Sequence, residues 1–278
     1  MTDLTFTLSS GRHMGVTTLG DPFSTRVVVL CHPMPGSSGF DPNPLVTADS
    51  GVRVLSFERP GYGGSEPLRE GESRQVQARA DDIAEYLTSH HVKVEQGQHI
   101  QFGAVGWGFG GAIALSLAAR HPALISRVAV VGLAVRALRS AQDNPLPNPE
   151  SNPLGTHPPS FGWDALGIDS NDPMFAKSGL ALRLDHMLAQ AAAQGSVGIE
   201  TDSAAARDFS WADELGSVQA AIVLIYGAAD RGIGTSPGRW LAQRIPQGRV
   251  ARVPGGGSLA IVNVWRRILD HAAPRGSA

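Results

Sequence analysis

The chain has 278 residues, enough for one large α/β domain with an insertion and a core that needs no disulfide. Its 23 basic and 25 acidic residues give a net charge of −2, which provides no general positive field for nucleic acid or an anionic membrane. A single cysteine, Cys31, excludes an internal disulfide and any metal site with several cysteine ligands.

The N-terminus contains no targeting or membrane segment that we can identify. Residues 1–6 carry no basic stretch and no long apolar run, and no segment approaches the ~18 apolar residues of a membrane span. We therefore expect a cytoplasmic protein whose partner is a small molecule, with no nucleic acid and no membrane. Short alternating segments at 4–8 and 14–19 predict the first strands.

Buried strands and amphipathic helices alternate through the next part of the chain. Apolar runs at 27–31, 52–57 and 100–105 predict strands of a mainly parallel sheet that is covered on both faces. Ser73 is a candidate N-cap for a helix with a period of 3.6, whose apolar face contains Val76, Ala80, Ile83, Ala84 and Leu87. A second helix follows at 111–120 and ends before Pro122.

The pattern changes between about 131 and 220. Prolines at 145–149 and 158–159 indicate an irregular segment. A helix is predicted after it from an apolar stripe made of Leu180, Leu184, Met187, Leu188 and Ala191. A strand at 222–227 and a last helix from Leu259, with Val262, Trp265, Ile268 and Leu269 on its buried side, complete the alternation.

A Gly-Trp-Gly-Phe-Gly motif lies between the strand at 100–105 and the helix at 111–120. It has the frame of the nucleophile elbow G-x-S-x-G, with Gly108 where that motif has serine. The elbow requires a left-handed backbone at its centre, which costs other residues ~1–2 kcal/mol and glycine almost nothing. Gly108 therefore suits the turn and supplies no nucleophile.

With this motif in place, the chain resembles the α/β-hydrolase superfamily along almost its whole length. Residues 27–37 look like the family's strand and H-G-x-P-G oxyanion loop, with Pro33 in place of glycine. Residues 59–65 are similar to the family's R-x-G-x-G-x-S turn. The strand at 222–227 and the residues after it match the segment that delivers the catalytic acid, at Asp230. Residues 253–259 match the P-G-x-G-H-L loop, with Ser258 where the family has histidine.

The resemblance implies an α/β-hydrolase fold: a mainly parallel twisted sheet with helices on both faces and an inserted helical lid. In these terms, residues 1–132 form the first part of the core, 133–219 the lid and 220–278 the last part. The two N-terminal strands would open the sheet as antiparallel strands. The lid helix would cover a pocket at the carboxyl ends of the strands, where open α/β sheets bind ligands.

The resemblance also defines the site. Gly108, Asp230 and Ser258 occupy the positions of the family's Ser-Asp-His triad, so two of its three members are replaced. Removing the nucleophile or the base alone usually costs ~10⁶-fold in rate, so we expect no serine-hydrolase activity. The oxyanion donors would be the backbone amides of Met34 and Phe109, which these replacements do not touch. Two interpretations of this frame are open. Either an anionic or enolate oxygen still binds at these amides, or the elbow persists only because the fold needs it.

Each remaining candidate has both a functional and a structural interpretation. Asp230 would be the catalytic general acid or base, or a turn residue before 232–234. Candidate binding residues, each with packing, a turn or solvent exposure as the alternative, are His32, Ser37, Trp107, Trp163 and His186.

Three functions remain open at this point. The first is a repurposed non-hydrolytic enzyme, of cyclase, lyase or isomerase type, that acts on a small organic metabolite through the oxyanion hole. The second is a catalytically silent small-molecule binding protein, and the third is an inactive variant of an esterase-like hydrolase. None of them requires a cofactor or a metal.

Overall fold

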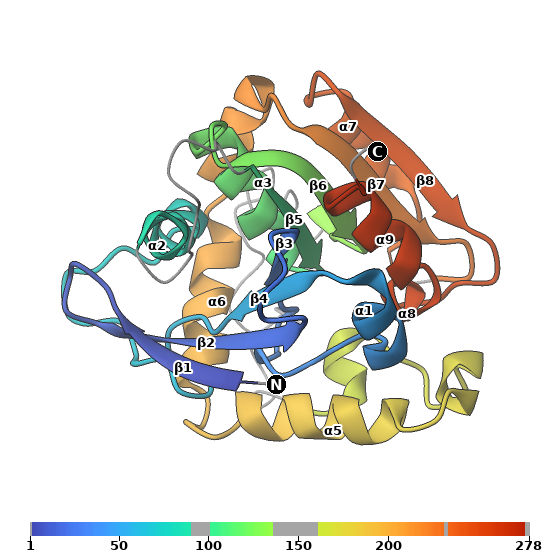
Figure 1. Ribbon diagram of the computed structural model, residues 1–278, viewed down its shortest axis with the longest axis horizontal. Coiled ribbons are helices and arrows are strands. Elements are labelled where there is room, and N and C mark those ends of the chain that lie inside the picture. The colour runs from blue at the N-terminus through green and yellow to red at the C-terminus, as the bar shows by residue number, and fades with distance from the viewer. Residues whose placement is uncertain (1, 90–100, 136–160, 231–232, 276–278) are drawn as a thin grey trace, which may run out of the picture.

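A twisted sheet runs through the molecule, with helices on both of its faces (Figure 1). The structure is a computed structural model that describes residues 2–89, 101–135, 161–230 and 233–275. Within these residues the sheet has eight strands in the order β1-β2-β4-β3-β5-β6-β7-β8. The strands are β1 (Thr2–Thr7), β2 (His13–Gly20), β3 (Val27–Cys31), β4 (Arg53–Phe57), β5 (Phe102–Trp107), β6 (Ile125–Val131), β7 (Ala221–Gly227) and β8 (Gly248–Val253).

Strand directions confirm the predicted sheet. β1 pairs antiparallel with β2, with Phe6 opposite Met14, and β2 pairs antiparallel with β4. All the pairs from β4 to β8 are parallel. Parallel strands need both faces covered, and β3 and β5 are accordingly buried along their whole length.

Helices cover the sheet on both faces and create two separate cores (Figure 1). The helices are α1 (Pro44–Ser50), α2 (Val76–Thr88), α3 (Gly110–Arg120), α5 (Leu180–Ala191), α6 (Val197–Arg207), α7 (Ser236–Ala242), α8 (Ala260–Asn263) and α9 (Trp265–Ala272). One core contains the apolar sides of α2, α3 and α7, and the other contains those of α5, α8 and α9. No helix among the described residues is long and apolar enough to cross a membrane.

The predicted apolar stripes are confirmed, whereas two helix ends differ from the prediction. Every predicted stripe residue of α2 and of α5 is buried. Ser73 is not the N-cap of α2, because the helix begins three residues later and the Ser73 hydroxyl accepts the Gln75 amide in a preceding bend. The last helix is two helices, α8 and α9, separated by Val264 at φ −111° and ψ 17°.

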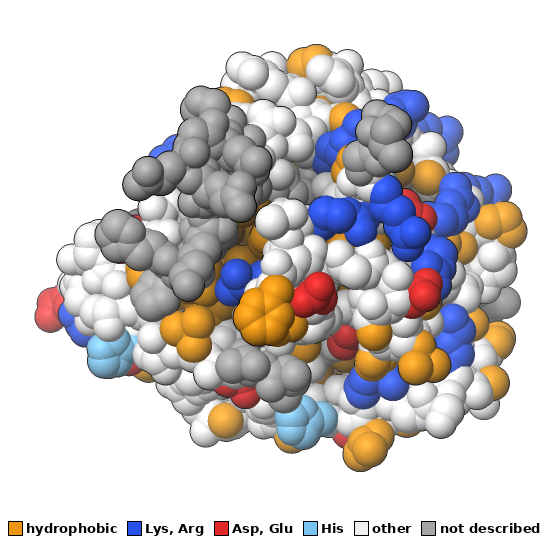
Figure 2. All heavy atoms as spheres, in the orientation of Figure 1, with side chains coloured by type: hydrophobic (Ala, Val, Ile, Leu, Met, Phe, Trp, Pro, Cys, Tyr) orange, Lys and Arg blue, Asp and Glu red, His pale blue; other side chains and the backbone are white. Residues whose placement is uncertain are grey.

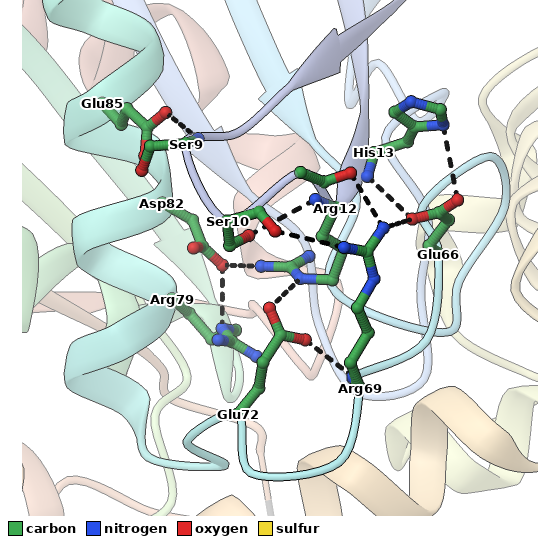
Figure 3. A network of polar contacts seen from close by, with 11 residues as sticks. Ser9, Ser10, Arg12, His13, Glu66, Arg69, Glu72, Arg79, Asp82 and Glu85 are labelled. Carbon is green, nitrogen blue, oxygen red and sulfur yellow. Dashed lines mark hydrogen bonds and ion pairs between the residues drawn. The ribbon is translucent and has the colours of Figure 1, made fainter.

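The N-terminal hairpin is attached to α2 by a buried arginine (Figure 3). Arg12 is 1% exposed and pairs with Glu72 at 3.3 Å and with Asp82 at 2.5 Å. Asp82 also pairs with Arg79 on the preceding turn of α2, at 3.1 Å. The charges of this cluster are thus compensated within it, which a buried ionic group requires.

We call the segment between β6 and β7 the insertion, and the structure describes its residues 133–135 and 161–219. They form three short 3-10 helices and the longer helices α5 and α6. The 3-10 helices are η2 (Trp163–Leu166), η3 (Pro173–Ala176) and η4 (Ser210–Ser217). The proline segments at 145–149 and 158–159 lie outside the described residues. Division into 1–132, 133–219 and 220–278 stays a prediction.

Positive charge concentrates in the last elements, which the net charge of −2 does not reveal. Residues 236–278 contain seven arginines and one aspartate. Figure 2 shows Lys and Arg side chains gathered over the region where Figure 1 places α9, β7 and β8. Of the described side chains there, Arg249 and Arg252 are exposed on β8, at the end of the sheet order.

Candidate functional site

Gly108 forms the turn between β5 and α3. Its φ is +54°, in the left-handed region that the motif predicts, and its amide donates to the Val131 carbonyl of β6 at 2.8 Å. The Gly111 amide closes the turn on the Gly108 carbonyl at 3.0 Å. The turn from β5 to α3 therefore has the left-handed backbone that the motif predicts.

The glycines of the elbow serve different purposes. A Cβ on Gly106 would lie 2.4 Å from the Gly110 carbonyl oxygen, and a Cβ on Gly110 would lie 2.2 Å from the Cys31 carbonyl oxygen. A Cβ on Gly108 would instead meet Pro33 Cβ at 3.5 Å, an ordinary contact. Close packing excludes a side chain at positions 106 and 110, whereas position 108 has space and only its backbone conformation favours glycine.

Opposite the elbow, the loop after β3 is held by a buried arginine. Arg59 donates from Nη1 to the His32 carbonyl at 2.7 Å and from Nη2 to the Pro33 carbonyl at 2.8 Å. Its other side pairs with Asp202 of α6, at 2.9 Å from Nε and 2.6 Å from Nη2. Arg59 is 5% exposed and Asp202 is 3% exposed.

Our sequence reasoning did not identify Asp202 and gave Arg59 no role beyond its turn motif. The two residues lie 143 positions apart, so no local pattern joins them. The insertion makes further contacts with the same turn, because Gln194 Nε2 donates to the Gly63 and Ser65 carbonyls at 2.8 and 2.7 Å. The R-x-G-x-G-x-S turn is thus the place where α6 meets the core.

His32 has a structural environment. Burial, reinforced by the nearby Arg59 charge, lowers the pKa of His32 well below its usual value, so the ring is neutral. Its Nδ1 lies 2.9 Å from the Pro33 carbonyl oxygen, which can only accept, so this geometry assigns the proton to Nδ1. Nε2 is then free to accept the Arg59 amide at 3.4 Å.

Because the unfolded chain takes up a proton at His32 near pH 6.5 and the native ring does not, this histidine should make stability depend on pH. The contribution is fully present above about pH 6.5 and is lost as the pH falls below it, by about 1.4 kcal/mol per pH unit. We expect His32→Asn to lose less free energy of unfolding than wild type between pH 6.5 and 5.0 in urea titrations. The exposed His186→Asn is the control, and equal slopes for the two variants would contradict this assignment.

Asp230 follows the end of β7 and takes part in a turn. Its Oδ1 accepts the Ile233 amide at 3.1 Å, and its carbonyl accepts the Gly234 amide at 3.3 Å. This is the turn that the structural interpretation of Asp230 predicts. The carboxylate has a second oxygen and further lone pairs, which remain able to accept a proton.

Ser258 follows β8 in the loop that packs on the end of β7. The Gly256 carbonyl accepts the Ala229 amide at 2.8 Å, which brings this loop next to the Asp230 turn. The Ser258 hydroxyl donates to the Gly167 carbonyl, after η2 of the insertion, at 2.6 Å. Ser258 therefore ties the loop to the insertion.

The other candidate binding residues have the following places. Trp107 is buried and packs on Phe40 with ring centroids 5.3 Å apart. The Ser37 hydroxyl donates to Gln190 Oε1 of α5 at 2.9 Å, and the Trp163 indole donates to Asp185 at 2.8 Å. His186 is exposed on α5. Their proposed binding roles stay predictions.

The thiol of Cys31, at the end of β3, is unreactive. Burial raises the pKa of the Cys31 thiol to about 12, so it is not a nucleophile at neutral pH.

The described residues contain no cluster of three His, Cys, Asp or Glu side chains that could hold a metal ion. A small cavity lined by Cys31, Glu58, Arg59 and Arg79 lies beside β4 and α2, with room for about one water molecule.

Comparisons with known proteins agree with this geometry. Residues 26–156 match the family model described as the alpha/beta hydrolase fold. A pimeloyl-[acyl-carrier protein] methyl ester esterase of Aromatoleum aromaticum is 27% identical over 218 residues, which is 73% of this chain and 79% of that protein.

Solved structures are similar over nearly the whole chain. An enol-lactonase from Burkholderia xenovorans LB400 superposes with a TM-score of 0.69 at 16% identity, covering 96% of this chain and 97% of that one. A hydrolase from Pseudomonas aeruginosa PA01 gives a TM-score of 0.70 at 16% identity, covering 97% and 96%. At these identities the similarity shows the fold.

Proposed function

Because the chain belongs to the α/β-hydrolase superfamily, we propose that it is a non-hydrolytic enzyme that acts on a small organic metabolite through the oxyanion hole of that fold. The observation that supports this most strongly is Gly108 at φ +54°: the elbow is complete in its backbone and lacks only an attacking atom. Amides in such a turn can stabilise negative charge on an oxygen without any nucleophile.

The substrate class follows from what two amides can recognise. The Met34 and Phe109 amides would bind an oxygen that gains negative charge, as a carbonyl does when it becomes an enolate. Relatives named for a methyl ester and an enol-lactone favour a carbonyl compound. Reactions that need charge stabilisation and positioning, but no covalent intermediate, are cyclisation, elimination and isomerisation.

The amide of Phe109 can be tested by proline substitution, because the φ of this residue is one that proline adopts. Phe109 has φ −58°, close to the value that proline fixes, and proline has no amide hydrogen. We expect Phe109→Pro to turn over a carbonyl substrate ~10²–10³-fold more slowly than Phe109→Ala, since removing one oxyanion donor has this effect. Alanine is the matched control because it loses the same ring and keeps the amide.

The assay is a panel of small lactones, enol esters and hydroxy acids incubated with each variant and followed by mass spectrometry. Equal turnover by the proline and alanine variants would rule out an oxyanion role for this amide.

A second candidate, a small-molecule binding protein without catalysis, is favoured by the turn at Asp230. A carboxylate used to accept the Ile233 amide is less available for proton transfer. In this case Gly108 only enlarges the floor of the site, and the insertion covers the bound molecule.

Neither candidate predicts ester hydrolysis. We expect no labelling by serine-directed phosphonates and no hydrolysis of activated esters above background, because we identify no activated hydroxyl at the site. Gly108→Ser together with Ser258→His is expected to restore weak esterase activity, and either change alone to restore none, since triad members act as a unit. Stoichiometric labelling of the wild type at Ser37, Ser38 or Ser258 would contradict this expectation.

A further inference from the structure

The carbonyl and amide of the Pro33–Met34 peptide point in opposite directions, because this peptide is trans. Whatever holds the Pro33 carbonyl therefore also sets the direction of the Met34 amide. Two donors hold it: Arg59 Nη2 at 2.8 Å and His32 Nδ1 at 2.9 Å. Both lie on the core side of the loop, so the Met34 amide faces away from them.

Arg59 is in turn held by the insertion. Both oxygens of Asp202 lie 2.9 Å from Arg59 Nε, and one lies 2.6 Å from Nη2. A planar guanidinium that is fixed along one edge has the direction of its remaining donors fixed as well. The edge not used by Asp202 is the one that reaches the His32 and Pro33 carbonyls.

Helix α6, which carries Asp202, packs closely on the turn at residues 59–65. A Cβ on Gly61 would lie 2.8 Å from the Gly198 amide nitrogen, so the two backbones are in direct contact. If α6 moved away, Arg59 would lose the carboxylate that compensates its charge in the buried state. Docking of α6 therefore fixes the Nε and Nη2 side of the guanidinium, and the two loop carbonyls bind its remaining donors.

We propose that Arg59 and Asp202 are positioning residues that couple the docking of α6 to the direction of the Met34 amide, and so to the oxyanion site. This inference rests on the function proposed above. Neither residue touches the reacting atoms. Their role is to make the oxyanion hole complete only when the insertion is in place.

The sequence provides a specific reporter of this peptide. Proline is followed by methionine at two places, Pro33–Met34 and Pro173–Met174. Protein labelled with ¹³C at proline carbonyls and ¹⁵N at methionine therefore gives two signals in a carbonyl–amide correlation spectrum. The second pair lies in η3 of the insertion and serves as an internal reference.

We expect Arg59→Lys and Asp202→Asn each to shift the Pro33 carbonyl upfield, as it loses a hydrogen bond, and to move the Met34 amide. The Pro173–Met174 signal should stay in place. Arg183→Lys is the matched control, because Arg183 is another arginine that joins the insertion to a core carbonyl, that of Asp41 at 3.1 Å. It should leave Pro33–Met34 unchanged.

An unmoved Pro33–Met34 signal in both variants would overturn the inference, as would equal movement of both signals in Arg59→Lys. If Asp202→Asn does not fold, Arg59→Lys decides, since it keeps the buried charge. Titration of the wild type with hexanoate tests the oxyanion site separately. If the Met34 amide signal does not move during this titration, the result counts against the proposed function. It leaves the result on Arg59 and Asp202 intact.

Discussion

Asp202→Ala is expected to lower the free energy of unfolding by about 3–5 kcal/mol, because it removes the counterion of a buried arginine and leaves that charge uncompensated. Arg59 has no access to solvent that could replace the carboxylate, since it is only 5% exposed. The loss also loosens contacts beyond the pair, because Arg59 holds the His32 and Pro33 carbonyls.

Urea titrations monitored by circular dichroism measure this effect. Asp213→Ala is the control, because Asp213 lies exposed in η4 and such surface substitutions change stability by about 0.5 kcal/mol or less. If Asp202→Ala were no more destabilising than Asp213→Ala, the ion pair would not hold α6 to the core.

Asp230→Asn is expected to reduce turnover by ~10²–10⁴-fold with a much smaller change in ligand affinity, if the protein is an enzyme that uses this carboxylate for proton transfer. The geometry makes the substitution selective. Asparagine keeps a side-chain oxygen that can accept the Ile233 amide, so the turn persists while the titratable group is lost.

Turnover is followed by product mass and affinity by calorimetry, with the same carbonyl panel for wild type and variant. Unchanged turnover would remove Asp230 from the mechanism and leave the oxyanion amides as the catalytic groups. Measurable binding without any turnover by the wild type would favour the binding protein.

Periodicity was sufficient to predict the layers of this fold. The stripe Leu180, Leu184, Met187, Leu188 and Ala191 is buried as a unit, because a spacing of three and four residues puts side chains on one face of a helix. The elbow was predictable from its motif, because part of its glycine requirement is local: a Cβ on Gly106 would meet Gly110, four residues later. The requirement at Gly110 comes instead from Cys31 at the end of β3, which no local pattern reveals.

The features that could not be predicted depend on partners far away in the chain. Ser258 donates to Gly167, 91 residues earlier, and Arg59 pairs with Asp202, 143 residues later. A local pattern holds no information on such pairs. Short elements were missed for a different reason, because α1 and α7 have only seven residues each and give too few turns for a period to appear.

The left-handed turn at Gly108 also affects how much change the rest of the chain can tolerate. A side chain at this φ would store ~1–2 kcal/mol of strain, which a serine hydrolase carries as a cost of its activity. With glycine that strain is absent. Since natural proteins stand only slightly above the stability they need, a margin of this size can absorb a typical destabilising substitution elsewhere. Residues that line the site are therefore freer to change here than in a serine-bearing relative, and a new substrate is easier to reach by mutation.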